Sequence, residues 1–214
     1  MTAPRDFGPT VIDFIGALDA GRLGQLAATL GVSSGSLSAL GLGWYEQRRA
    51  FSFPMCDGHG RAIGIRLRGL DGRKFAVKGS KEGLFVPDLA PEDTSLMIAE
   101  GATDVAALLD MGFVNVIGRP SCSGGVTLVC DLVRHRQVEE AILLADQDEP
   151  GQRGANNLAS VLLVYVPRVR VVFPPIGVKD IRQWLQVGGT RVDVETAITK
   201  ATVQRGVFRA RAGT

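Results

Sequence analysis

Acidic side chains stand at the ends of two apolar segments in the second half of the sequence. Glu100 follows one such segment, Asp104 comes one helical turn later, and Asp146 and Asp148 follow another. If the two segments are neighbouring parallel strands, their ends bring Glu100, Asp146 and Asp148 close together. Two like charges about 4 Å apart repel by about 4 kcal/mol at a surface-like dielectric, so such a cluster requires a cation. Carboxylate oxygens with room for water and phosphate suit Mg²⁺, which supports phosphoryl transfer.

Each of these acids also has a structural interpretation when it is taken alone. Asp148 could cap a helix, and Asp104 could be a first-turn acid that the helix dipole favours. It is the combination of the acids, with Lys179 and Asp180 shortly after a further apolar segment, that favours a functional site.

The elements that would position these acids alternate between strand and helix. Short buried strands are predicted at residues 96–99, 114–117, 141–145 and 169–173. Helices are predicted at 103–111, from the end of a Gly/Ser turn at 120–125 to about residue 135, at 152–163, near 181–186 and near 192–204. Repeated strand–helix units with buried strands predict an α/β domain: a parallel four-stranded sheet with flanking helices. Ligands of such sheets bind at the carboxyl ends of the strands, where the acids stand.

The stretch from residue 48 to residue 81 is strongly basic. It holds nine Lys and Arg side chains and two acidic ones, although the whole chain has a net charge of only +2. Alternating segments at 49–55, 62–68 and 73–78, separated by Asp-Gly turns, predict a small antiparallel meander. Arg66 and Arg68 share one face of a strand, because side chains repeat every two residues. That face suits a phosphate backbone, or it is an ordinary solvated surface.

Short helices are predicted upstream, between residues 10 and 40. Part of this region is similar to a helix-turn-helix, but its exposed positions would be Ser34, Gly35, Ser36 and Ser38, which cannot read base edges in the manner of Arg, Asn or Gln. A plain helical hairpin is favoured. We therefore divide the chain into a helical segment at 1–44, a basic β subdomain at 45–92, an α/β domain at 93–205 and a flexible basic tail at 206–214.

Several classes of protein are disfavoured by what the sequence lacks. Three cysteines without a CxxC pair, and only two histidines, do not make a zinc ribbon or a disulfide framework. No P-loop is present, and the GxSxG match at 31–35 follows a predicted helix instead of the strand that a nucleophile elbow needs. No long apolar run or secretory leader is evident. These features predict a soluble cytoplasmic protein.

The acidic motifs resemble those of a known domain. Ile98-Ala-Glu100-Gly-Ala-Thr-Asp104, followed by Ala145-Asp146-Gln-Asp148-Glu-Pro-Gly151 with Ala155 beyond, is similar to the Toprim domain of primases, topoisomerases, nucleases and recombination proteins. The segments 53–58, 62–68 and 78–85 resemble the basic subdomain that precedes Toprim in phage and plasmid primases. Lys179 to Leu185 resembles the segment that follows it, although Arg182-Gln183 stands where Asn-Asp is favoured. The chain thus resembles the catalytic core of bacterial and phage-type DNA primases.

The resemblance implies a role for each matching residue. Glu100 would be the general acid/base, and Mg²⁺ would be bound by Asp146 and Asp148 with support from the acids at 104 and 180. Two ions are expected, Mn²⁺ is expected to be able to substitute for Mg²⁺, and no zinc is expected. The residues expected to hold nucleic acid or nucleotide are Arg66, Arg68, Lys74, Lys78, Lys81 and Lys179. The reaction would be synthesis of short RNA primers on single-stranded DNA from ribonucleoside triphosphates.

The same resemblance implies partners and leaves alternatives open. A replicative helicase or a separate DNA-binding protein would deliver the template, and no membrane is involved. Without a zinc ligand set, poor unaided initiation is expected. A Toprim nuclease uses the same acids, and a non-catalytic nucleic-acid-binding accessory protein would share the basic face. A topoisomerase is disfavoured because the chain offers only Tyr45 and Tyr165 as a nucleophile, and a recombination mediator because it needs four zinc-binding cysteines.

Overall fold

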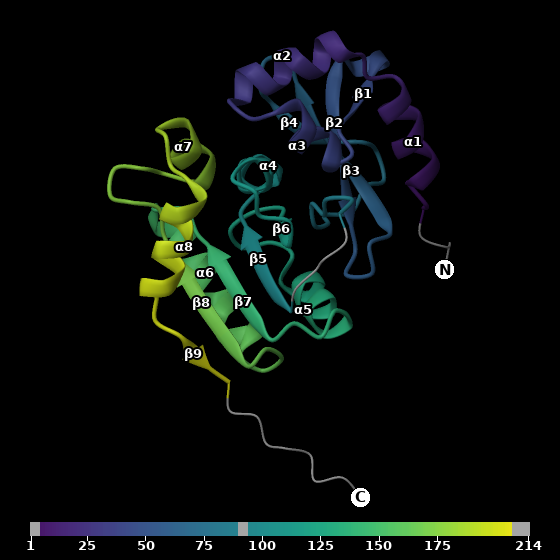
Figure 1. The fold of residues 1–214 in the computed structure, drawn as a ribbon. Coiled ribbons are helices and arrows are strands. Elements are labelled where there is room, and N and C mark those ends of the chain that lie inside the picture. The colour runs from purple at the N-terminus through teal and green to yellow at the C-terminus, as the bar shows by residue number, and fades with distance from the viewer. Residues whose placement is uncertain (1–4, 90–93, 207–214) are drawn as a thin grey trace, which may run out of the picture.

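A computed structural model describes residues 5–89 and 94–206 of the chain. It contains two β-sheets, one antiparallel and one mainly parallel, in the order along the chain that the sequence predicts (Figure 1). Most of the predicted basic tail, residues 207–214, lies outside the described residues. The domain boundaries proposed at residues 44, 92 and 205 stay predictions.

The antiparallel sheet has the strand order β1-β2-β3-β4. Its strands are β1 (Gly43–Tyr45), β2 (Ala50–Cys56), β3 (Ala62–Gly69) and β4 (Lys74–Ala76). The predicted meander is β2 to β4, and β1 is a strand that the prediction missed, with the 3₁₀ helix η1 (Glu46–Arg48) between β1 and β2. We call this sheet and its turns the basic subdomain.

The second sheet has the order β6-β5-β7-β8-β9. Its strands are β5 (Ser95–Ala99), β6 (Val116–Gly118), β7 (Glu140–Leu144), β8 (Arg168–Val172) and β9 (Gln204–Arg205). The first four are parallel, as predicted, and β9 adds a short antiparallel edge. The helix predicted to reach residue 204 instead ends at Lys200, because Arg170 donates to the carbonyls of Ile198 and Ala201 and so satisfies its last turn.

Helices cover both faces of the parallel sheet. On one face lie α4 (Ala102–Asp110), α7 (Ile181–Gln186) and α8 (Arg191–Lys200), and on the other α5 (Val126–His135) and α6 (Glu149–Leu162). Side chains of β5 alternate between the two cores: Met97 and Ala99 pack towards α4, whereas Leu96 and Ile98 pack towards α5 and α6. This two-sided burial explains why the strands are continuous apolar segments. We call this part the α/β domain.

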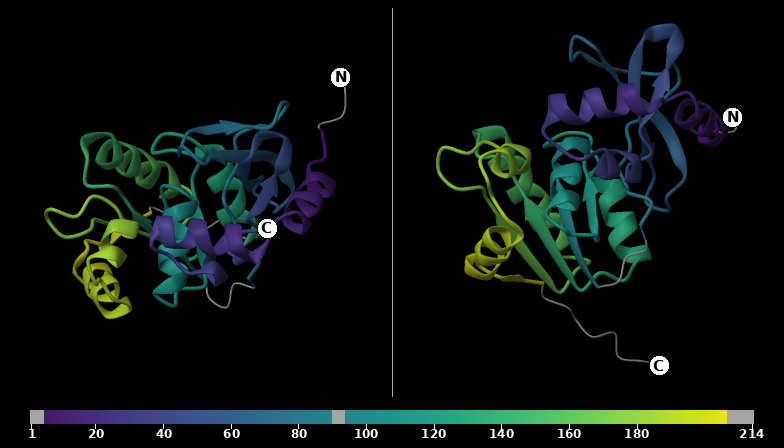
Figure 2. Two further views of the ribbon diagram at one scale, coloured as in Figure 1. Left: turned by 90° about the horizontal axis from the view of Figure 1, so that it is seen from above. Right: turned by 45° about the horizontal axis from the view of Figure 1, so that its top comes forward.

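Three helices precede the first sheet: α1 (Gly8–Gly16), α2 (Ala20–Leu30) and α3 (Ser34–Ala39). Helix α3 is docked on α4, because Asp110 accepts hydrogen bonds from the backbone N–H and hydroxyl of Ser33 and from the hydroxyl of Ser36. Ser36 is therefore buried, and its predicted exposure was wrong. Gly31 is the left-handed residue that ends α2, so the GxSxG match does not follow a strand. Figure 2 shows these helices beside the antiparallel sheet.

A short extended segment joins the two sheets. The backbone of Leu84 exchanges hydrogen bonds of 2.8 Å with Cys56 at the end of β2, and the next residue, Phe85, exchanges bonds of 2.9 and 2.8 Å with Gly118 at the end of β6. The ladder fixes the basic subdomain next to the carboxyl end of the parallel sheet. Within the described residues, no helix is both long and apolar enough to cross a bilayer.

Candidate active site

A cavity of about 380 Å³ lies where the basic subdomain meets the carboxyl end of the parallel sheet. Its lining from the basic subdomain and the joining segment is Phe53, Arg66, Arg68, Lys74 and Phe85. Its lining from the α/β domain is Glu100, Gly101, Ala102, Thr103, Asp104, Pro120, Ser121, Cys122, Asp146, Lys179, Asp180 and Arg182. The first face thus carries three cations and no acid, and the second carries four acids and two cations.

The acids that follow β5 and β7 meet as predicted, because these strands are adjacent and parallel. Glu100 directly follows β5, Asp146 follows β7 after one intervening residue, and the backbone N–H of Asp146 donates to Glu100 Oε1 at 3.4 Å. Asp148 lies two residues further on and is half exposed. Its Oδ1 accepts from the backbone N–H of Gly151 at 2.9 Å, which caps α6. Asp148 can therefore cap α6 with one carboxylate oxygen and still have the other available for the metal binding expected of it.

Two further acids come from α4 and from the start of α7. Asp104 is almost completely buried, and its Oδ1 accepts from the backbone N–H of Arg182 at 3.2 Å. Asp180 caps α7 by accepting from the backbone N–H of Gln183 at 2.7 Å. Both carboxylates line the cavity with Glu100 and Asp146.

The acids are close enough to affect one another's ionisation. Burial, and after it the charges of Glu100, Asp104 and Asp180, raise the pKa of Asp146 to about 7. Burial and the charge of Asp180 raise the pKa of Asp104 to about 6, and burial raises that of Glu100. Each raised pKa shows that the surroundings of the carboxylate stabilise its charged form less well than water does.

The donor set has the right chemistry for a hard divalent cation, since all its ligands are carboxylate oxygens. In residues 5–89 and 94–206, however, no three such side chains converge as a ligand set for a metal ion. Mg²⁺ is often held by only one or two carboxylates together with water and substrate phosphates. The arrangement therefore fits a metal ion that is bound partly by carboxylates of the protein and partly by the phosphates of a substrate.

The cationic face is built on β3 and β4. Arg66 and Arg68 pair across the ladder with Ala76 and Lys74, so the two arginines and Lys74 point to the same face, which lines the cavity. Partial burial lowers the pKa of Arg68 and of Lys74, and neighbouring cations lower them further. Arg66 also forms an ion pair with Glu82 at 3.6 Å, and the charge of Asp104 opposes the lowering of the pKa of Lys74.

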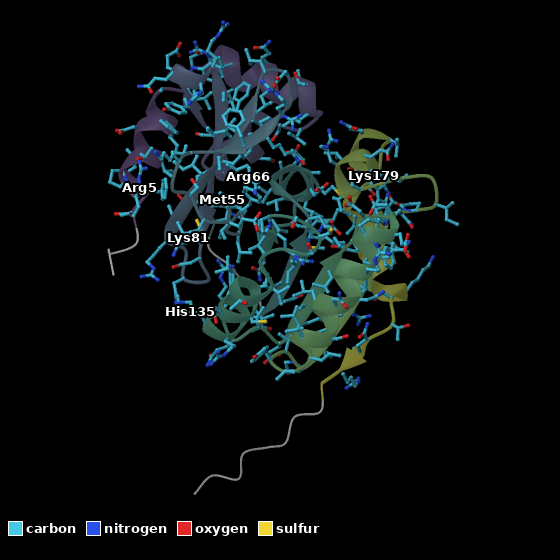
Figure 3. The ribbon with its side chains drawn as sticks, turned by 180° about the vertical axis from the view of Figure 1, so that it is seen from behind. Arg5, Met55, Arg66, Lys81, His135 and Lys179 are labelled. Carbon is cyan, nitrogen blue, oxygen red and sulfur yellow. The ribbon has the colours of Figure 1, made fainter. Side chains whose placement is uncertain are left out.

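The other predicted phosphate contacts divide between the cavity and the outer surface. Lys179 lines the cavity, whereas Lys78 and Lys81 are exposed and do not. In Figure 3, Lys81 lies on the far side of the basic subdomain from Lys179, with Arg66 between them. Lys78 and Lys81 could contact only nucleic acid that extends beyond the cavity.

Comparisons with known proteins identify the fold. No protein-family model matches the sequence, and no curated protein is significantly similar to it. Solved structures do match. The E. coli primase catalytic core has a TM-score of 0.70 and 17% identity over 91% of this chain and 79% of that one. This chain has the fold of a primase catalytic core.

Two further primase structures support the same conclusion. A DnaG primase catalytic domain bound to single-stranded DNA has a TM-score of 0.73 and 17% identity, over 91% of this chain and 77% of that one. The primase fragment of the bacteriophage T7 primase-helicase protein has a TM-score of 0.65 and 19% identity, over 80% and 72% of the two chains. The resemblance drawn from the acidic motifs is thus confirmed for the fold.

Two arginines of this primase-core fold were not predicted as site residues. Arg119 directly follows β6, as Glu100 and Asp146 follow their strands, and its charge opposes the rise in the pKa of Glu100. Its Nε donates to the carbonyl of Gly124 at 3.1 Å, and its buried Nη2 has no hydrogen-bond partner among the described residues. Arg182 lines the cavity beside Asp104. The strand-end position of Arg119 was the signal that could have found it.

Gly151 of the acidic motif is required by the closeness of the acids. A Cβ added there would lie 2.8 Å from both Cβ and the carbonyl oxygen of Asp146 and 3.1 Å from Glu100 Oε1. We expect Gly151→Ala to lower the free energy of unfolding by about 1–3 kcal/mol and to displace both acids. Urea denaturation measures the change.

The matched control is Gly24→Ala, in the exposed middle of α2, where an added Cβ meets nothing within 4 Å. This substitution should stabilise the chain by about 0.5–1 kcal/mol. Equal stabilisation by both substitutions would mean that the space around Gly151 is not restrictive.

Proposed function

We propose that this chain catalyses primase-like nucleotidyl transfer, the synthesis of short RNA primers on single-stranded DNA. The observation that carries the proposal is the meeting of two faces in one cavity. The acids at the ends of adjacent parallel strands oppose the cations of β3 and β4. Acids next to a cationic groove suit a reaction in which phosphates are both bound and transferred.

The chain's own residues supply binding and proton transfer in this reaction. Arg66, Arg68 and Lys74 hold the template backbone or the incoming triphosphate. Glu100 accepts the proton of the ribonucleotide 3′-hydroxyl, and its raised pKa makes it a better base than an ordinary glutamate. The 3′-oxygen bonds to the α-phosphorus of the next nucleotide as the bond to pyrophosphate breaks.

Mg²⁺, for which Mn²⁺ can substitute, is the cofactor that we propose for this site. Asp146 and Asp148 would hold it, with Asp104 and Asp180 in support. When bound, it neutralises charge on the attacking and leaving oxygens. Without it, the acids would repel the triphosphate on which they are meant to act.

Single-stranded DNA and ribonucleoside triphosphates are the proposed substrates. The DnaG catalytic domain among the matching structures is bound to single-stranded DNA, and the T7 fragment comes from a primase-helicase protein. We propose a replicative helicase, or a separate DNA-binding protein, as the partner that delivers the template to this chain.

One assay separates this proposal from its alternatives. The chain is incubated with single-stranded DNA, labelled ribonucleotides and Mg²⁺, and the products are resolved beside the input DNA. Lengthened RNA is the expected result. Shortened DNA would instead identify a nuclease with the same acids, and a mobility shift without either product would identify a non-catalytic binding protein.

A further inference from the structure

One cysteine of the chain lines the candidate active site. Cys122 belongs to the loop between β6 and α5, is half-buried and forms part of the wall of the cavity. Its backbone is fixed by close packing, because a Cβ added at Gly154 of α6 would collide with the carbonyl oxygen of Cys122. The thiol is therefore held at the edge of the space into which small molecules enter.

An arginine with an unpaired donor lies inside the same loop. Arg119 is only 3% exposed, its Nε donates to the carbonyl of Gly124, and its buried Nη2 has no hydrogen-bond partner among the described residues. Burial lowers the pKa of this guanidinium, and the charges of Glu100 and Cys122 oppose that lowering. The attraction between a guanidinium and a thiolate is mutual. A neighbouring arginine favours the thiolate, which is the reactive form of a cysteine.

The other two cysteines have surroundings that disfavour the thiolate. Burial, followed by the charge of Asp57, raises the pKa of Cys56 to about 11. Burial, followed by the charge of Asp131, also raises the pKa of Cys130. A thiol that stays protonated is a poor nucleophile. All three cysteines lie in described residues and are free, and of the three it is Cys122 that lines the cavity.

We propose that Cys122 is a redox modification site, oxidised by hydrogen peroxide and held in its oxidised form by Arg119. The thiolate sulfur attacks one oxygen of the peroxide, so that the S–O bond forms as the O–O bond breaks. Sulfur loses the two electrons that the peroxide gains, and the thiolate and H₂O₂ give a sulfenic acid and hydroxide. The new oxygen is an acceptor for the unpaired Nη2 of Arg119.

Oxidation would also stop the proposed reaction, and this consequence alone rests on the proposed function. It adds an oxygen to the wall that also carries Glu100, the proposed base, and it engages Arg119, whose charge acts on Glu100. Dithiothreitol reverses the change, because it reduces the sulfenic acid to the thiol with release of water and is itself oxidised to its cyclic disulfide.

Trapping of the sulfenic acid on the full chain tests the modification site. The protein is treated with hydrogen peroxide and dimedone at neutral pH, and peptide mass spectrometry follows labelling at each cysteine, in buffer and in urea. In the folded chain, Cys122 should be labelled about tenfold or more faster than Cys56 and Cys130. Cys122 should also react faster in the folded chain than in urea, where its sequence neighbours remain but the loop does not.

Arg119→Gln removes the charge that favours the thiolate and should slow labelling of Cys122 to its rate in urea. Arg119→Lys should retain most of the wild-type rate. The matched control is Arg182→Gln, at a cavity arginine on a different element, which should leave the labelling rate nearly unchanged. Thermal denaturation checks that each variant is folded, and the comparison of folded with unfolded wild type needs no variant.

Primer extension measures the consequence, with each protein compared with its own untreated sample after catalase has removed the peroxide. The wild type should lose about tenfold or more of its activity and regain it with dithiothreitol. Cys122→Ser should resist peroxide, whereas Cys130→Ser should be inactivated like the wild type.

Two results would overturn the modification site: labelling of Cys122 that is no faster in the folded chain than in urea, or labelling at the wild-type rate in folded Arg119→Gln. Equal inactivation of the wild type and Cys122→Ser would overturn the proposed effect on the reaction. The labelling does not depend on synthesis. A chain that is labelled selectively at Cys122 but makes no RNA would refute the proposed function and support the modification site.

Discussion

Replacing Asp146 by asparagine is expected to abolish nucleotide addition while leaving the fold intact. The amide keeps the size of the side chain but removes the charge that binds the metal, so turnover should fall more than about a hundredfold. In the absence of Mg²⁺, the variant should be as stable as the wild type or more so, because a poorly compensated buried charge has been removed.

The dependence of stability on pH gives a second measure of the same charge. The pKa of Asp146, about 7, lies above the 3.8 of an unperturbed aspartate. The unfolded chain therefore loses this proton first, and stability decreases as the pH rises from about 4 to about 7. Thermal denaturation in the presence of a chelator should show the advantage of Asp146→Asn growing across this range.

Controls distinguish the site from a general effect of lost charge. Asp148→Asn should also abolish synthesis, while the asparagine keeps the helix cap. Asp13→Asn, at an exposed acid of α1, should change neither turnover nor stability. Wild-type turnover in both site variants would show that these aspartates do not bind a catalytic metal.

Removing Arg66 and Arg68 together is expected to weaken single-strand binding by about tenfold or more at low salt, and equally for all sequences. Each phosphate contact on a single strand contributes about −0.7 to the slope of log affinity against log salt concentration, so the slope should flatten by about 1.4. Fluorescence anisotropy with labelled oligonucleotides at several salt concentrations measures this change.

The matched control replaces two arginines of the same subdomain that lie outside the cavity. Arg61 and Arg73 are exposed and paired with Asp57 and Asp71. Arg61→Ala with Arg73→Ala should leave the slope nearly unchanged. A wild-type slope in the Arg66 and Arg68 variant would show that this face is merely solvated.

The acidic half of the site could be predicted because the acids directly follow segments that the local sequence pattern identifies as buried strands. Buried parallel strands are continuous apolar segments, so their ends can be found from the sequence, and the acids that follow β5 and β7 meet once those strands pair. Gly151 belongs to the same local signal, since it has to make room for Asp146 and Glu100.

The remainder depends on contacts between distant segments. Arg182 faces Asp104 across 78 positions of the chain, and no periodicity reports that contact. Ser36 was predicted to be exposed and is buried, because Asp110 of another helix binds it. Strand β9 pairs by backbone hydrogen bonds over two residues, so it leaves no hydrophobic pattern. Lys81 belongs to the same basic stretch of the sequence as Lys74, and only the three-dimensional arrangement shows that it lies outside the cavity.

Extension of a supplied primer tests the central claim most directly. A short RNA annealed to single-stranded DNA of defined sequence is incubated with the chain, Mg²⁺ and the next complementary ribonucleotide, and the RNA is resolved at single-nucleotide length. We predict addition of that nucleotide by the wild type, more efficiently than unprimed synthesis, and none by Asp146→Asn. An RNA that is never lengthened, or that is lengthened equally by Asp146→Asn, would contradict the assignment of this site to nucleotidyl transfer.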